Sequence, residues 1–137
     1  MSSALDLREV ARVADLMRKP NSVFVFGSNL GGKHGGGAAR VAHQHYGAVW
    51  SVGEGPRGRS YALPTMDADF VTLRLDEVAL SVQVFLVHAA EHPELTFAVT
   101  RIGCGIAGFS DEEIAPLFRD APANCELPEG WRTGVTA

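Results

Sequence analysis

The first half of the chain alternates between helical and strand-like patterns of apolar residues. Residues 4–18 carry apolar side chains at helical spacing, which predicts an amphipathic helix. The continuous apolar run over 23–26 then predicts a buried strand. A second helix is expected over 38–46, ended by Gly47. The stripe of the first helix consists of Leu5, Val10, Val13, Ala14 and Met17.

The middle of the chain predicts two more strands and a long helix. Strands are expected over 48–52 and 60–63, separated by the turn-rich segment 53–58. The residues from 75 to 92 follow a period of 3.6, and Pro93 stops the helix that this period predicts. Its apolar face is expected to consist of Leu75, Val78, Val82, Phe85, Leu86 and Ala89.

The last third predicts a central strand, a glycine loop and a capped helix. The strand is expected over 95–102. Ser110 and Glu113 have the spacing of a capping box, so a short helix should run to Phe118, with its length limited by Pro116. An edge strand is expected over 125–127, and the sequence does not place Trp131.

Strand–loop–helix units in this order predict a three-layer α/β/α fold with a mixed, mostly parallel central sheet. The length of 137 residues suits one domain over 1–137. In such sheets ligands bind beyond the carboxyl ends of the strands. Both glycine-rich loops follow a strand and precede a helix, so we expect them to open on that same edge.

Composition and charge narrow the classes of function. A formal net charge of −4 argues against a general nucleic-acid binder. No apolar stretch approaches the ~20 residues of a membrane span, and the N-terminus has no secretory signal pattern. We therefore expect a cytoplasmic protein, and we expect it to be a monomer. Cys104 and Cys125 are expected to be reduced thiols. His88 and His92 are four apart on a predicted helix, but without a third ligand nearby we expect a solvated helix end and no metal site.

Glycine density points to a phosphate-bearing ligand. Six of the 15 glycines lie over 27–37, and the last three directly precede a predicted helix, where free N–H groups attract an anion. A second glycine-rich loop spans 103–109. Two loops of this kind favour a phosphate site over a ligand-free surface loop. Neither the P-loop spacing nor the dinucleotide-binding fingerprint is present, which argues against ATP hydrolysis and hydride transfer.

Three segments carry a resemblance to a known family. They are Phe26-Gly27-Ser28-Asn29 through Gly35-Gly36-Gly37-Ala38-Ala39, then Arg101-Ile102-Gly103-Cys104-Gly105-Ile106-Ala107-Gly108-Phe109, and then Glu113-Ile114-Ala115-Pro116-Leu117. Over about residues 22–118 the chain resembles the macrodomain family. The second segment is the most specific, and it is similar to the glycohydrolase branch that removes ADP-ribose from glutamate side chains or from DNA bases.

The resemblance implies an ADP-ribose site built from both loops and no other cofactor. The first loop would hold the distal ribose and one phosphate, and the second would wrap the diphosphate, with Phe109 near the distal ribose. Asn29 would orient a ribose hydroxyl or a water. The residues expected to bind the ligand are Gly27, Ser28, Asn29, Gly35, Gly36, Gly37, Gly103, Cys104, Gly105, Ile106, Ala107, Gly108 and Phe109.

The catalytic residues of the family do not carry over. Met66 stands where the related branch has a lysine, and Ala107 stands where it has an acid. Asp67 is the first replacement candidate, as a base or a stabiliser of oxocarbenium charge, and its alternative is a turn residue. His34 is the second, and its alternative is a solvent-facing loop histidine. Cys104 as a nucleophile is less favoured than Cys104 as a small packing residue.

Two functions remain open from the sequence. The first is a hydrolase that removes ADP-ribose from an ADP-ribosylated protein or nucleic acid. The second is a non-catalytic module that binds or senses ADP-ribose or a related nucleotide. The absent lysine and acids favour the second, whereas a short chain with no predicted partner domain favours the first.

Overall fold

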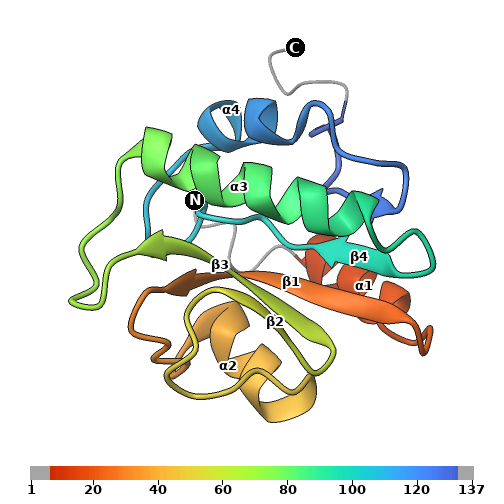
Figure 1. Cartoon of the computed structure of the whole chain (residues 1–137), viewed down its shortest axis with the longest axis horizontal. Coiled ribbons are helices and arrows are strands. Elements are labelled where there is room, and N and C mark those ends of the chain that lie inside the picture. Colours follow the sequence, from red (N-terminus) through yellow and green to blue (C-terminus); the bar gives the residue numbers. More distant parts are fainter. Residues whose placement is uncertain (1–6, 133–137) are drawn as a thin grey trace.

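A five-stranded mixed sheet forms the centre of the computed structural model, which describes residues 7–132 (Figure 1). The strand order is β2-β3-β1-β4-β5; β1 pairs in parallel with β3 and β4, β4 pairs in parallel with β5, and β2 is antiparallel to β3. Helices cover both faces, so the predicted three-layer α/β/α fold is confirmed. The elements are α1 (Leu7–Leu16), β1 (Ser22–Asn29), α2 (Gly37–His45), β2 (Gly55–Arg57), β3 (Ser60–Met66), α3 (Leu75–Ala90), β4 (Thr96–Val99), α4 (Asp111–Ile114), the 3₁₀ helix η2 (Ala115–Phe118) and β5 (Cys125–Glu126).

The central strand β1 is buried on both faces because successive side chains point to opposite sides. Val23 and Val25 join the core under α3, while Phe24 and Phe26 join the core under α1 and α2. The continuous apolar run of the sequence is therefore the signature of a strand between two helical layers.

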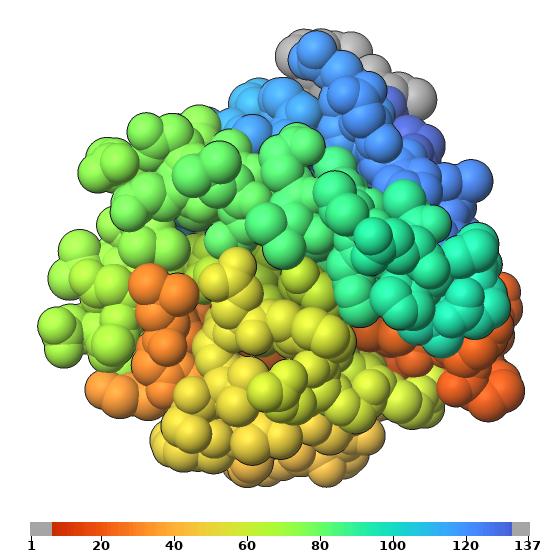
Figure 2. All heavy atoms as spheres, in the orientation of Figure 1, coloured from red at the N-terminus to blue at the C-terminus, as the bar shows by residue number. Residues whose placement is uncertain are grey.

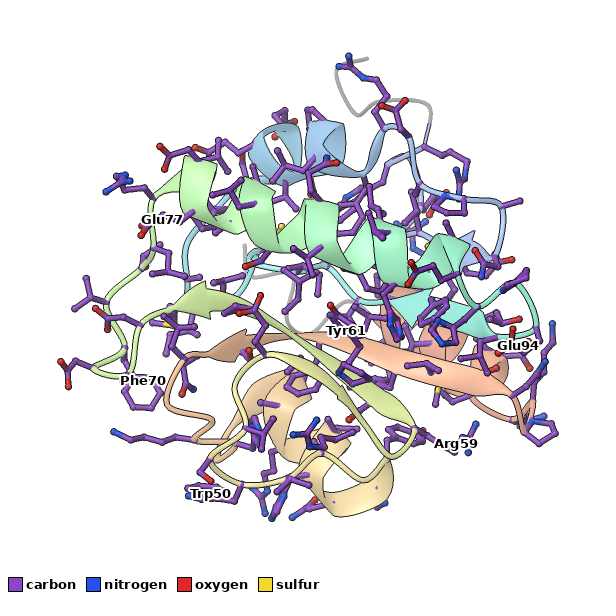
Figure 3. All side chains as sticks on the ribbon, in the orientation of Figure 1. Trp50, Arg59, Tyr61, Phe70, Glu77 and Glu94 are labelled. Carbon is purple, nitrogen blue, oxygen red and sulfur yellow. The ribbon has the colours of Figure 1, made fainter. Side chains whose placement is uncertain are left out.

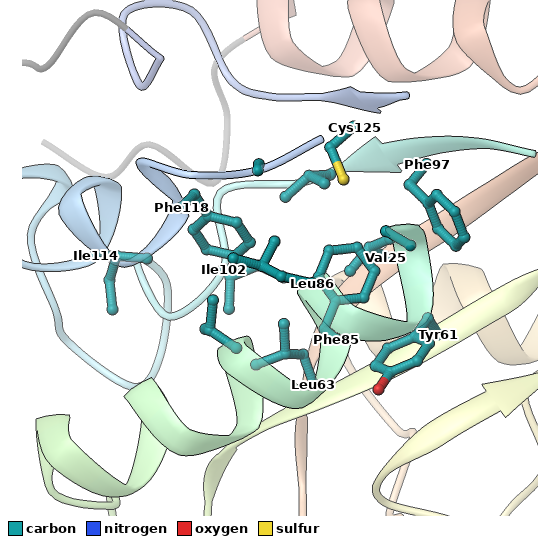
Figure 4. Packing of buried hydrophobic residues seen from close by; sticks show 14 of the residues in the cluster. Val25, Tyr61, Leu63, Phe85, Leu86, Phe97, Ile102, Ile114, Phe118 and Cys125 are labelled. Atoms are coloured by element: carbon teal, nitrogen blue, oxygen red, sulfur yellow. The ribbon is translucent and has the colours of Figure 1, made fainter. Parts of the chain in front are cut away.

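The core beneath α3 is the larger of the two and is rich in aromatic side chains (Figure 4). The ring of Phe85 lies 4.9 Å from that of Tyr61 and 5.4 Å from that of Phe97, measured between centroids. Trp131, which the sequence does not place, is 2% exposed and packs against the ring of Phe118. Of the apolar face predicted for α3, all but Leu75 are buried: Val78, Val82, Phe85, Leu86 and Ala89.

The core beneath α1 and α2 is built largely from small side chains. Five of its nine buried members are alanines, and Val13 and Met17 are the contributions of α1 and the turn after it. Small residues let the helices approach the sheet closely. This layer, and not the one under α3, holds the cleft described below.

The strand predicted over 48–52 is wrong. This segment is a loop in which Val49 and Trp50 are about half exposed, and Gly47 and Ser51 have φ of 81° and 75°. Left-handed backbone at both ends prevents an extended ladder, so the apolar residues here do not form a strand. The short strand β2 instead forms within the segment predicted as a turn, and it pairs with β3 through a tight hairpin at Gly58.

Other boundaries differ by a few residues. Strand β1 continues through Asn29, so Gly27, Ser28 and Asn29 belong to the strand and not to the loop. Strand β4 ends at Val99 rather than at residue 102. The capping box is confirmed, with the Glu113 amide donating to the Ser110 hydroxyl, and the helix then tightens to 3₁₀ geometry at Pro116.

Figure 2 shows the face of the molecule that α3 and the segment before β3 cover. Leu80, Val84 and Val87 on the outer side of α3 are exposed. Within residues 7–132, no helix combines the length and the apolar character needed to cross a bilayer.

Candidate functional site

A cleft of about 660 Å³ lies between α1 and α2 and extends from Phe24, in the first half of β1, to the loop after β4 at the carboxyl edge of the sheet. Its walls come from α1, α2, Phe24 and Gly27 of β1, Thr65 near the end of β3, and the chain that follows β4. Gly27 and Gly37 from the first glycine-rich segment and Gly103 and Gly105 from the second all line it. The expectation that the two segments open on the same edge of the sheet is therefore confirmed.

The floor of the cleft lies where β1 passes the start of the loop after β4. A Cβ atom on Gly27 would lie 3.4 Å from the amide nitrogen of Gly103, and 3.7 Å from the hydroxyl of Thr65. Thr65 and Thr100 flank this point at the ends of β3 and β4, and both donate their hydroxyls to carbonyls of β1. These are ordinary van der Waals distances, so a Cβ atom at position 27 would fit here without displacing either neighbour.

The second glycine-rich loop, residues 103–109, is open to solvent at its tip. Gly103 and Gly108 have φ of 76° and 87°, a conformation that favours glycine. The Phe109 amide closes the loop on the Gly103 carbonyl at 2.9 Å. At the tip Ile106 is 86% exposed, and a Cβ atom on Gly105 would meet nothing within 4 Å. Backbone groups of this loop are thus accessible from the cleft.

Other members of the second loop serve to anchor it. The carbonyl of Ala107 accepts a hydrogen bond from the Thr72 hydroxyl at 2.9 Å, which ties the loop to the segment after β3. Phe109 packs against the core under α3 and lies 3.1 Å from where a Cβ on Gly103 would be. Ala107 lines the cleft, whereas Gly108 and Phe109 are outside its lining.

The polar side chains of the first segment are turned to the backbone. The hydroxyl of Ser28 donates to the carbonyl of Gly53. The side chain of Asn29 donates to the Lys33 carbonyl at 3.0 Å and accepts from the Lys33 amide at 2.9 Å. Ser28 and Asn29 are buried, and neither lines the cleft. Gly35 and Gly36, exposed before α2, are also outside the lining, whereas Gly37 is part of it.

His34 is buried, which contradicts the alternative of a solvent-facing loop histidine. It is 1% exposed, with its ring packed between Phe26, His43 and Trp50, and Figure 3 shows Trp50 at the surface. Its Nε2 lies 3.0 and 3.1 Å from the carbonyl oxygens of Val49 and Val52. Carbonyls only accept, so Nε2 carries a proton. Nδ1 has no hydrogen-bond partner among residues 7–132, and His34 is not among the cleft residues.

Asp67 has the geometry of a turn residue. One carboxylate oxygen accepts from the amides of Asp69 and Val71 at 2.8 and 3.0 Å, the pattern of an Asx turn. This turn carries Phe70, which has φ of 64° and, as Figure 3 shows, lies on the side to which β1 and β3 point. Asp67 follows Thr65 by two residues, but its side chain does not line the cleft.

Cys104 is held as a neutral thiol. Burial, followed by the charge of Asp111, raises its pKa to about 12. Its Sγ lies 3.8 Å from a carboxylate oxygen of Asp111. A thiolate is the nucleophilic form, so this environment favours the packing role over the catalytic one.

Two charged side chains that the sequence did not single out line the cleft, Glu9 on α1 and Arg101 after β4. Glu9 is held by Arg12, whose Nε and Nη2 donate to its two oxygens at 2.9 and 3.0 Å. Arg12 also donates to the carbonyl of Val99 at 2.6 Å and thereby fixes α1 against β4. Arg101 stands two residues before the second glycine loop, a signal that was visible in the sequence. No sequence signal pointed to Glu9, because the pattern of α1 gave no indication that this helix lines a cleft.

No group of three His, Cys, Asp or Glu side chains among the described residues has a geometry that can hold a metal ion. His88 and His92 lie with ring centroids 4.3 Å apart, and the Nδ1 of His92 contacts the His88 carbonyl. Burial, and then the neighbouring His92, lower the pKa of His88, whereas Glu91 opposes them.

Comparisons with known proteins found no match to the chain among family models, curated proteins or solved structures.

Proposed function

We propose that the chain binds ADP-ribose in the cleft at the carboxyl ends of its parallel strands. The observation that carries this proposal is the meeting of both glycine-rich segments, through Gly27, Gly37, Gly103 and Gly105, on one cleft. The volume of about 660 Å³ falls within the range of ~300–1,000 Å³ typical of small-molecule sites. The resemblance of the same segments to macrodomains supplies the identity of the ligand.

The second loop and the start of α2 offer backbone donors to phosphate oxygens. The α2 N-cap is Gly36, which provides no side-chain acceptor, so the first amides of this nine-residue helix remain available. The exposed backbone around Gly105 lines the same cleft. Neutral N–H groups can hold a diphosphate without a basic surface, which agrees with the net charge of −4.

The opposite part of the cleft suits a flat, apolar group. Val10 and Val13 of α1 face this space together with Val41 of α2, and the aromatic side chains of Phe24 and Tyr46 also line it. Val10 is 56% exposed, although the sequence predicts it on the apolar stripe of this helix. A nucleobase placed here would cover Val10, which favours a nucleotide over a simple anion.

Hydrolysis of an ADP-ribosylated protein or nucleic acid is the second candidate, and Glu9 is the observation that favours it. Glycosidic cleavage needs a carboxylate to activate a water or to stabilise oxocarbenium charge. Glu9 places one on the cleft wall, held by Arg12. The sequence suggested Asp67 and His34 as catalytic residues. Neither side chain lines the cleft, so their catalytic roles stay predictions.

Calorimetric titration with ADP-ribose, followed by incubation with an ADP-ribosylated acceptor, tests both candidates. We expect heat of binding and a thermal shift with ADP-ribose, and their absence would reject the proposal. Release of ADP-ribose from the acceptor by the wild type would support hydrolysis, and binding without release would reject it. Glu9→Gln and Asp67→Ala would identify the acid, with the exposed Glu94→Gln as the matched control.

A further inference from the structure

We propose that Arg101 contacts the diphosphate of the ligand through a guanidinium that Asp111 and Trp131 hold in place. This inference rests on the proposed function, because it assigns a residue to the phosphates of the same ligand. It adds a charged side chain to a phosphate site for which the sequence predicted only backbone groups.

The guanidinium of Arg101 is fixed along one edge. Its Nε donates to Oδ1 of Asp111 at 3.0 Å, and its Nη2 donates to Oδ2 of the same carboxylate. This two-point contact fixes both the position and the plane of the group. Arg101 is 22% exposed in its side chain, so the pair is partly removed from water and its geometry is well defined.

Asp111 is itself fixed by the chain that follows. The indole Nε1 of the buried Trp131 donates to Oδ1 of Asp111 at 2.8 Å. Burial raises the pKa of Asp111, but the hydrogen bonds from Arg101 and Trp131 outweigh it and lower the pKa below its ordinary value. The carboxylate therefore stays charged at neutral pH and keeps the guanidinium in one orientation.

The remaining edge of the guanidinium is available to a ligand. Arg101 lines the cleft beside Gly103 and Gly105, at the end where the second glycine loop begins. Its Nη1 makes no hydrogen bond to any of residues 7–132. Guanidinium groups prefer phosphate oxygens, and the contact is stronger than a neutral hydrogen bond.

The neighbouring charges place the phosphates on one side of the cleft. Glu9 lies on the α1 wall close enough to influence Arg101 electrostatically, and Arg12 offsets its charge. A phosphate group would be repelled by Glu9 and attracted by Arg101 and the loop amides. We therefore place the diphosphate against the second loop, with the neutral part of the ligand towards α1.

The test compares ligands with and without phosphates. Binding of ADP-ribose, inorganic diphosphate and adenosine would be followed by NMR titration for the wild type and for Arg101→Gln combined with Asp111→Asn. This double substitution replaces the ion pair by a neutral pair, so that no buried charge is left unpaired. Arg119→Gln with Asp120→Asn makes the same change of charge at two exposed, adjacent positions and serves as the matched control. Arg101→Lys provides a variant that keeps the charge but not the planar fork.

We expect the Arg101/Asp111 variant to bind ADP-ribose and inorganic diphosphate roughly tenfold to a hundredfold more weakly, with adenosine affinity changed less than about twofold. Arg101→Lys should lose part of this affinity. An equal loss for all three ligands, or no loss for diphosphate, would overturn the role of Arg101. If the wild type binds diphosphate through Arg101 but not ADP-ribose, the proposed function fails and the phosphate contact stands. If the wild type binds none of the three ligands, both fail.

Discussion

The two glycine-rich segments have similar compositions but use glycine for different purposes. In the first segment glycine permits close packing: a Cβ atom on Gly32 would lie 2.3 Å from the carbonyl carbon of Ser51. In the second segment glycine exposes the backbone, because a Cβ atom on Gly105 would meet nothing within 4 Å. The first segment is therefore mainly structural, and the second is mainly a surface for a ligand.

This difference shows that glycine content alone does not locate a binding loop. Three polar side chains of the first segment, those of Ser28, Asn29 and His34, are buried and engage backbone groups of the chain itself. Only Gly27 and Gly37, close to the ends of the segment, face the cleft. The packed first segment stabilises the floor of the cleft, whereas the second loop, residues 103–109, stays exposed to solvent.

The largest effect is expected from Gly32→Ala. The residue has φ of 64°, and its Cβ would overlap the backbone of Ser51 and Val52, which cannot move away as a side chain would. We expect a loss of about 3–5 kcal/mol in the free energy of unfolding, from left-handed strain and steric overlap together. Denaturant unfolding measures it. Gly36→Ala is the control, because Gly36 is extended and its Cβ is unobstructed; equal losses would remove the distinction between packed and open glycines.

A large effect is also expected on the reactivity of Cys104. Since its pKa is raised to about 12, the thiol stays protonated well above neutral pH. We expect alkylation by iodoacetamide at pH 8 to be roughly a hundredfold slower, or more, than that of an unperturbed thiol. Peptide mass spectrometry would follow Cys104 and the buried Cys125 separately. Rapid alkylation of Cys104 in the folded protein would reopen its role as a nucleophile.

Asn29→Ala should affect stability more than binding. It removes both hydrogen bonds to Lys33 from a site that is 5% exposed, so we expect a loss of about 2 kcal/mol in the free energy of unfolding. Well below the melting transition, ADP-ribose affinity should stay within about threefold of the wild type. A stable variant that has lost binding would restore the ribose contact that the sequence predicts.

Gly105→Val should show the opposite behaviour. The position has room for a side chain and lines the cleft, so stability should change by less than about 0.5 kcal/mol. The added methyl groups occupy the space of the ligand, and we expect ADP-ribose affinity to fall roughly tenfold, or about 1.4 kcal/mol, by calorimetry. Ala90→Val adds similar bulk at an exposed position at the end of α3 and should leave binding unchanged.

The sequence predicted most of the layered fold, because its signals are local. The helix over 75–92 and the capping box at Ser110 depend on spacing within one turn or one face, and the structure confirms both within a few residues. The strand over 48–52 failed for the opposite reason. Its apolar residues satisfy a strand pattern, but whether a ladder partner exists depends on how Gly47 and Ser51 turn the chain.

The candidate site was predictable only in part. The convergence of two glycine segments follows from the rule that parallel strands share a carboxyl edge, and it was found. The positions of Glu9, Arg101 and Trp131 depend on tertiary contacts with residues far away in sequence. Trp131 reaches Asp111 only because the final turns fold back over η2, and no local pattern encodes that return.

The guanidinium of Arg12 connects the α1 wall of the cleft to the β5 edge of the sheet. It reaches the carbonyl of Val99 at the end of β4 and that of Glu126 in β5, while it holds Glu9 on the wall. Strand β5 has only two residues; it pairs with β4 and buries Cys125 in the core under α3, and Arg12 links it to α1. A substitution that loosens β5 would therefore tilt α1 and widen the entrance of the cleft. Ligand affinity would then change although β5 does not contact the ligand.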